Sequence, residues 1–177
     1  VKMEDKAGNT TEESLQFSVN RYGSVYTLAS ESGEWLKNGF CSYVQEGRNI
    51  VITETNVDEV VERNISYTLG GIDAETVEIK EQENCSSEEK SKGMYFKTRK
   101  ISSANSWYQY QYIIQADNFA KEGLYSIQID SKDRAGNHTS NVSNKHSDSN
   151  LHIQFAVDQT APSAVITGTE NGGFYEE

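Results

Sequence analysis

Apolar residues in this chain alternate with polar ones in short runs, with no sustained helical period. A period of two places successive side chains on opposite faces of the backbone, as in a β-strand. The clearest case is Leu124–Ser131, where Tyr125, Ile127 and Ile129 share one face and polar residues occupy the other. This pattern predicts a half-buried antiparallel strand.

Eight such segments, each bounded by turn-forming residues, predict strands. Helical turns are predicted only at Val57–Arg63 and Asp117–Lys121, and the polar stretches Glu81–Gly93 and His138–Asn150 are predicted to be exposed loops. Strands separated by turns predict an all-β fold, a sandwich of two antiparallel sheets. The eight segments are Ser24–Ala29, Asn49–Val57, Asn64–Leu69, Thr76–Glu81, Met94–Ile101, Trp107–Gln115, Leu124–Ser131 and Leu151–Val157.

An internal repeat is the most informative feature of the sequence. Asp5–Asn9 (DKAGN) recurs as Asp133–Asn137 (DRAGN), and Leu15–Val19 (LQFSV) recurs as Ile153–Val157 (IQFAV). The first pair is 128 positions apart and the second is 138 apart, so the later copy carries ten additional residues between the two motifs. A period of this size indicates whole domains in series.

The DxAGN motif has the chemistry of a tight turn. Asp and Asn side chains bond to nearby backbone amides, and Gly8 or Gly136 can take a positive φ. We therefore expect Asp133, Gly136 and Asn137 to form the hairpin that joins the last two strands. Calcium is the alternative, because Asp130, Asp133 and Asn137 bring oxygen atoms close together, but their spacing is not that of an EF-hand loop.

The repeat sets the expected domain boundaries. Residues 1–19 would be the C-terminal hairpin of a preceding repeat, 20–157 one complete domain, and 158–177 the linker and first strand of a following repeat. Because Val1 is not a start Met and no leader follows it, we expect a fragment of a longer chain. Flanking strands of this kind leave open edges, which can pair with the central domain or with a neighbouring molecule.

Charge and motif content exclude several functions. With 27 Asp and Glu against 16 Lys and Arg, the net charge of -11 repels phosphate backbones and anionic lipid, so we expect no nucleic-acid partner. No run of about 18 apolar residues exists, so we expect no membrane insertion. GxSxG, GxxxxGK[ST] and GxGxxG are all missing, and the three His and two Cys lack metal-ligand spacing. We expect no catalytic residue, no cofactor and no metal.

The ends of the repeat resemble a known family. The segments Gly123–Asn137 and Phe155–Pro162, followed by Val165–Tyr175, are similar to bacterial immunoglobulin-like repeats. Those repeats occur in tandem on large cell-surface proteins of Gram-positive bacteria, especially clostridia. The middle of the chain, about residues 33 to 117, is only compatible with the family. Gly23 and Ser24 stand where the second linker has Ala161 and Pro162, so the first linker departs from the pattern.

The resemblance implies an immunoglobulin-like sandwich that acts as a spacer, a stalk or an adhesion module at the cell wall, without catalytic residues. Adjacent repeats of the same parent chain are the implied partners. Tyr125, close to the start of the penultimate strand, suits a tyrosine corner, although an ordinary core tyrosine is the alternative. Cys41 and Cys85 are a candidate disulfide pair in an extracellular protein, with free thiols as the alternative.

Aromatic residues raise a second functional hypothesis. Trp35, and Trp107 with Gln109 and Gln111 on one strand face, are candidate ligand-binding residues, because flat rings stack on sugars. The competing explanation is that a sandwich buries its largest side chains, which fits the alternate tyrosines of the same strand better. The sequence thus leaves open a module that binds a glycan or a host surface protein. It also leaves open an accessory domain of a surface carbohydrate-active enzyme.

Overall fold

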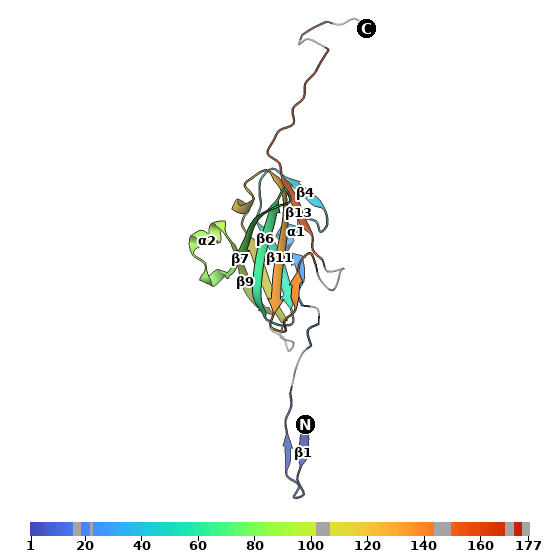
Figure 1. Cartoon of the computed structure of the whole chain (residues 1–177), viewed down its shortest axis with the longest axis vertical. Helices are drawn as coiled ribbons and strands as arrows, with labels where there is room; N and C mark the ends of the chain where they lie inside the picture. The colour runs from blue at the N-terminus through green and yellow to red at the C-terminus, as the bar shows by residue number, and fades with distance from the viewer. Residues whose placement is uncertain (16–18, 22, 102–106, 144–149, 169–171, 175–177) are drawn as a thin grey trace.

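Two β-sheets packed face to face form the body of the structure, a computed structural model that describes residues 1–15, 19–21, 23–101, 107–143, 150–168 and 172–174 (Figure 1). The first sheet has the strand order β3-β5-β10-β9-β8. Its strands are β3 (Val25–Leu28), β5 (Ile50–Asn56), β8 (Lys80–Glu81), β9 (Met94–Ile101) and β10 (Trp107–Ile114).

The second sheet has the order β4-β13-β11-β6-β7, and the short β12 also pairs with β11. Its strands are β4 (Cys41–Val44), β6 (Val60–Leu69), β7 (Ile72–Glu78), β11 (Gly123–Asp133), β12 (His138–Ser140) and β13 (Ile153–Val157). The short helices are α1 (Ser30–Gly33), η1 (Gln82–Asn84), α2 (Ser87–Lys92) and η2 (Ala116–Phe119).

The strand order is that of an immunoglobulin-like sandwich. Lettered along the chain, β3, β5, β10 and β9 lie in the order A-B-E-D, and β6, β11 and β13 in the order C-F-G, with β7 in the place of C′. The expectation of wholly antiparallel sheets is wrong in two places, because β4 with β13 and β8 with β9 are parallel pairs. Both are formed by edge strands that the chain reaches after crossing from one sheet to the other.

The core lies between the inner faces of the two sheets. Its largest fully buried side chains include Tyr112 of β10, Tyr125 of β11 and Phe155 of β13, with Phe119 of η2. Phe119 meets Tyr125 and Phe155 edge-on, with ring centroids 5.2 and 5.0 Å apart. The alternation read from the sequence of β11 and β10 therefore gave the correct inward faces, since Tyr110 and Tyr112 are buried and Trp107 is 42% exposed.

Several predicted elements differ from the structure. Val57–Arg63 is not a helical turn, because β6 already begins at Val60. The predicted strand Thr76–Glu81 is split at Ile79, where the chain leaves β7 and enters β8 in the opposite sheet. The predicted loop His138–Asn150 begins with β12, and β4 was not anticipated. The predicted strand Met94–Ile101 is found with the same bounds, and η2 lies at the predicted turn Asp117–Lys121.

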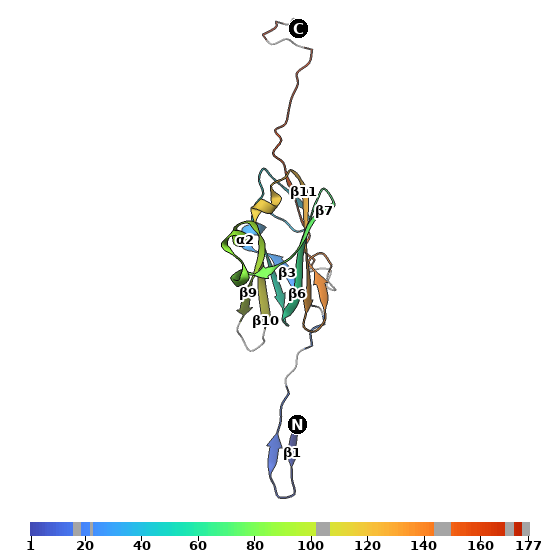
Figure 2. The same ribbon diagram turned by 60° about the vertical axis from the view of Figure 1, so that its left-hand side comes forward.

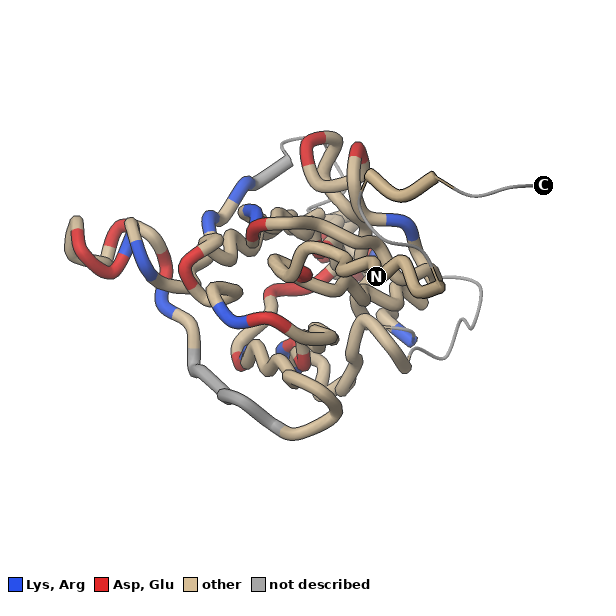
Figure 3. The backbone as a smooth tube through the Cα atoms, turned by 90° about the horizontal axis from the view of Figure 1, so that it is seen from above, with Lys and Arg blue, Asp and Glu red and all other residues tan. Residues whose placement is uncertain are grey.

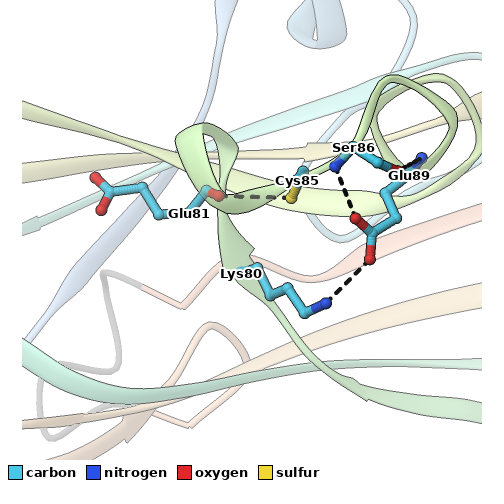
Figure 4. Close-up of polar contacts among 5 residues, drawn as sticks. All are labelled: Lys80, Glu81, Cys85, Ser86 and Glu89. Carbon is cyan, nitrogen blue, oxygen red and sulfur yellow. Dashed lines mark hydrogen bonds and ion pairs between the residues drawn. The ribbon is translucent and has the colours of Figure 1, made fainter.

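The predicted loop Glu81–Gly93 is folded rather than irregular (Figure 2). It contains η1 and α2, and α2 begins with a capping box in which Ser86 and Glu89 exchange side chain–backbone hydrogen bonds. Lys80 Nζ lies 3.0 Å from Glu89 Oε1, and the Cys85 thiol donates to the Glu81 carbonyl at 3.5 Å (Figure 4). Cys85 packs on the outer face of the first sheet against Val51, Tyr95 and Ile113.

The flanks extend from opposite ends of the sandwich (Figure 1). Strands β1 (Lys2–Glu4) and β2 (Thr10–Glu12) form a two-stranded sheet of their own. Of the predicted strand Leu15–Val19, residues 16–18 lie outside the described part, and Leu15 and Val19 are exposed. No strand forms in residues 158–168 or 172–174 of the C-terminal flank.

Candidate functional site

The Asp133–Asn137 turn closes one end of the sandwich with a compact set of hydrogen bonds. One carboxylate oxygen of Asp133 accepts the backbone N–H of Asn137 at 2.8 Å, and the other accepts Asn137 Nδ2 at 2.9 Å. Gly136 has a φ of +86° and donates its N–H to the Asp133 carbonyl at 3.0 Å. Asp, Gly and Asn thus take the roles expected from turn chemistry.

The N-terminal hairpin repeats the hydrogen bonds that join the Asp, Gly and Asn of this turn. Asp5 accepts the Asn9 backbone N–H at 2.9 Å and Asn9 Nδ2 at 2.8 Å, and Gly8 has a φ of +85°. The hydrogen bonds from Asn9 lower the pKa of the Asp5 carboxyl. Strand register is preserved as well, because Glu4 pairs with Thr10. In the sandwich, the residues 128 positions later pair in the same way, Lys132 with His138 and Asp130 with Ser140.

Asp130 and Asp133 do not converge on one point. They lie on opposite faces of β11, Asp130 exposed and Asp133 only 2% exposed, and Asp130 accepts Gln128 Nε2 instead. The Asp133 oxygens are occupied by N–H donors. The DxAGN motif therefore has the hydrogen bonds of a tight turn, whereas its oxygen atoms are not arranged around one point as calcium binding would require. In the described part of the chain, no three His, Cys, Asp or Glu residues cluster as metal ligands would.

The turn also holds the incoming N-terminal linker. Asn20 Nδ2 donates to Asp133 Oδ2 and to Asn56 Oδ1, both at 2.7 Å, and Asn20 Oδ1 accepts the Gly23 N–H at 3.1 Å. Asn137 Nδ2 in turn donates to the Asn20 carbonyl at 3.1 Å. The Asn20 side chain is thus hydrogen-bonded to the turn, to β5 and to the backbone of the linker at Gly23. We call this set of residues, Asn20, Gly23, Asn56, Asp133 and Asn137, the N-terminal joint.

Gly23 fixes how closely the linker can approach the turn. Its φ is +73°, and a Cβ atom at this position would lie 2.5 Å from Thr139 Cγ2 of β12. Any other residue would meet both an unfavourable backbone conformation and a steric clash. Gly23 stands where the second linker has Ala161, and at this glycine the first linker lies directly against β12.

The opposite end of the sandwich holds the outgoing linker. The Asp158 N–H donates to the Val44 carbonyl at 2.9 Å, which continues the β4–β13 pairing past the last strand. Glu122 accepts the Gln159 N–H at 2.5 Å and Thr160 Oγ1 at 3.0 Å. A groove of about 790 Å³ lies between this linker and the end of β4. Both linkers are therefore anchored by the domain that lies between them.

The last strand of the second sheet is divided into two pieces, β12 and β13. β12 and β13 pair with the same edge of β11, and Asn141 fills the gap between them. Its Oδ1 accepts the Ile129 N–H at 2.7 Å, and its Nδ2 donates to the carbonyls of Ile127 and Leu151 at 3.2 and 2.8 Å. Because Asn141 is fully buried, its side-chain amide replaces the missing strand backbone.

A buried acid lies in the core. Glu54 of β5 is fully buried and accepts the Tyr112 hydroxyl, while its Oε1 has no hydrogen-bond partner among the described residues. Burial raises the pKa of Glu54 above its ordinary value, and it also raises the pKa of Tyr112. The neutral acid is therefore the form that the core favours.

Tyr125 has the geometry of a tyrosine corner. Its hydroxyl donates to the Lys121 carbonyl at 2.8 Å, four residues upstream and just before β11 begins. Its ring is 1% exposed and stacks on Phe155 with a centroid distance of 5.2 Å. The Tyr125 side chain thus links the core to the backbone of the segment that precedes β11.

The predicted ligand residues do not form one site. Trp107, Gln109 and Gln111 share the outer face of the first sheet, with Trp107 at the start of β10. Trp35 instead packs against the core and meets Phe155 edge-on at 5.3 Å, near the end of the sandwich where β13 finishes. Trp35 is therefore separated from the other three, and of the two predicted tryptophans Trp107 is the one whose ring lies on the outer face of a sheet.

The candidate disulfide is absent from the structure, in which Cys41 and Cys85 are both free thiols. Cys41 lies in β4 at the edge of the second sheet, whereas Cys85 packs on the outer face of the first. Cys41 is thus part of the second sheet, whereas Cys85 lies outside the strands and packs on the first sheet, a separation that the sequence alone could not reveal.

Comparison with protein-family models gives no match to this chain, and comparison with curated proteins gives none either. Among the described residues, no helix has the length and apolar character needed to cross a membrane. The site therefore has to be interpreted from its own geometry.

Proposed function

We propose that the chain is a structural module of a tandem array, in which one immunoglobulin-like domain is flanked by parts of its neighbours. The observation that carries the proposal is the repeated turn, with the same hydrogen bonds and the same register at Asp5–Asn9 and Asp133–Asn137. In this proposal, β1 and β2 are the end of a preceding repeat and residues after Asp158 lead into a following one.

The attachments of the two linkers support a mechanical role for the sandwich in such an array. The linkers leave from opposite ends, and each is hydrogen-bonded to the domain, at Asn20 and at Asp158. Tension applied through them runs along the strands, so that β13 has to slide past β4 and β11 with many hydrogen bonds loaded together. Together with the resemblance to Gram-positive surface repeats, this supports a non-catalytic spacer or adhesion module outside the cell or at the cell wall.

Stretching single molecules tests this proposal. Held by its two ends, the chain should resist until the sandwich unfolds in one step. Held at cysteines introduced at Val19 and Asp58, which both lie beside the N-terminal joint at one end of the sandwich, it should unfold at lower force, because β3 is then peeled from β5 one hydrogen bond at a time. Equal, low forces in both directions would refute the spacer role.

A second function is favoured by the exposed ring of Trp107 on a sheet face. In this alternative, the domain binds a glycan or a host protein, or it serves as an accessory domain of a surface carbohydrate-active enzyme. The chemistry of that face decides which ligand to test first.

A further inference from the structure

The outer face of the first sheet is divided into two halves of different character. Near one end, Cys85 of the folded segment Glu81–Gly93 covers Val51, Tyr95 and Ile113. This segment is held there by side-chain hydrogen bonds from Gln115 to the Lys90 carbonyl at 2.8 Å and from Asn118 to the Lys92 carbonyl at 3.4 Å. The other half of the face carries no such cover among the described residues.

Strand register defines the uncovered half residue by residue. Gln109 lies between Thr55 and Arg99, and Gln111 lies between Thr53 and Lys97. Val25 and Thr27 of β3 extend these two rows, and Trp107 stands at the end of β10. We call this set the Trp107 platform; its members are Val25, Thr27, Thr53, Thr55, Lys97, Arg99, Trp107, Gln109 and Gln111.

The Trp107 platform carries two cations and no carboxylate, although acidic residues outnumber basic ones in the whole chain. Figure 3 shows how widely acidic positions are spread over the rest of the backbone. The ion pairs of the described residues involve other cations, at Lys80, Lys92, Lys132 and Arg134, so Lys97 and Arg99 have no carboxylate partner within the described part. The outer face of the second sheet differs, because Lys132 there is paired with Glu62 at 2.7 Å.

These groups match the chemistry of a sugar with one negative charge. A tryptophan ring offers an apolar face to the C–H groups of a pyranose, and amide and hydroxyl side chains exchange hydrogen bonds with its hydroxyls. Arginine binds a carboxylate through its planar fork. Diagonal neighbours on adjacent strands, such as Trp107 and Arg99, are roughly 7–8 Å apart, a distance that a disaccharide spans.

From this arrangement we propose that the Trp107 platform binds an oligosaccharide that carries a single uronic acid. The carboxylate of glucuronic acid is equatorial, so it stays in the plane of a ring stacked on Trp107 and reaches Arg99 and Lys97 along the sheet. An axial carboxylate, as in a sialic acid, points away from that plane. A single charge also limits repulsion by the net charge of -11, which salt screens beyond about 8 Å, whereas a long polyanion meets repulsion along its whole length.

Titration calorimetry of the whole chain with glucuronyl-xylotriose tests this inference, with xylotriose and sialyllactose as neutral and axial controls. We expect binding of glucuronyl-xylotriose that is at least about tenfold tighter than binding of either control. No binding, or equal affinity for sialyllactose, would overturn the proposal, and neither result bears on the spacer function.

Variants locate the binding on the platform. Trp107→Ala should weaken it about tenfold, whereas Tyr43→Ala, which removes an aromatic ring that is 77% exposed on the other sheet, should leave it unchanged. The double variant Lys97→Gln/Arg99→Gln should also lose about tenfold, and Lys2→Gln/Lys6→Gln, with the same net charge, should not. Equal losses from both double variants would show attraction by overall charge alone and would refute a site.

Discussion

Asn141 gives the sharpest test of how the interrupted strand is held. Replacing it with alanine removes the partners of three backbone groups, the Ile129 N–H and the carbonyls of Ile127 and Leu151. Each buried group that loses its partner costs about 1–3 kcal/mol, so with three such groups the free energy of unfolding should fall by at least about 3 kcal/mol. Such a loss is a large fraction of the 5–15 kcal/mol typical of a folded domain.

Asn38 is a matched control, because its side-chain amide also bonds to the backbone between β12 and β13. Its Nδ2 donates to the Asn150 carbonyl at 2.9 Å, and its Oδ1 accepts the His152 N–H at 2.7 Å. Both bonds are exposed, so water replaces them, and Asn38→Ala should cost less than about 1 kcal/mol. The two variants separate the effect of burial from the effect of hydrogen-bond number.

Urea unfolding followed by far-ultraviolet circular dichroism measures both costs, with equal m-values as the condition for comparing midpoints. A second variant, Asn141→Asp, keeps the acceptor for Ile129 but places a carboxylate against two carbonyl oxygens. It should be at least as unstable as Asn141→Ala at neutral pH. A cost below about 1 kcal/mol for Asn141→Ala, or equal costs at positions 141 and 38, would refute the role of Asn141 as a backbone substitute.

Two further predictions concern the core. Because burial raises the pKa of Glu54, the native state binds its proton more tightly than the unfolded chain, and stability should fall as pH rises from about 4.5 toward the raised pKa, by up to about 1.4 kcal/mol per pH unit. Glu54→Gln should remove this part of the slope in urea titrations between pH 5 and 8, and parallel curves for the two proteins would contradict it. Tyr125→Phe should lower the free energy of unfolding by about 1 kcal/mol through loss of the bond to Lys121, whereas Tyr43→Phe at an exposed position should not; equal effects would argue against the tyrosine corner.

Local pattern predicted the elements whose two faces differ most. Met94–Ile101 and the inward tyrosines of β10 follow from alternation alone, because a strand with one buried face has to repeat every two residues. The prediction failed where a segment changes sheets, as at Ile79, since a switch between sheets leaves no mark in an alternating sequence. It also failed at α2, where the Ser86–Glu89 capping box was the available signal.

The candidate sites divide in the same way. Turn chemistry identified Asp133, Gly136 and Asn137, since their bonds run to residues a few positions away. The partners that complete the N-terminal joint, Asn20 and Asn56, lie more than seventy positions from Asp133 and were not identified. Isolated asparagines carry no local pattern, so only the fold could bring them together.

By itself, then, the sequence determined the all-β class, the alternating faces and the repeated turn, all of which depend on residues close together in the chain. The tertiary structure alone decided the pairing of β4 with β13, the separation of Trp35 from Trp107, the free state of Cys41 and Cys85, and the burial of Glu54. The physical reason is that long-range contacts between strands are selected by the packing of the whole core. Chain entropy opposes each such contact, and only the combined burial of both sheets makes them favourable.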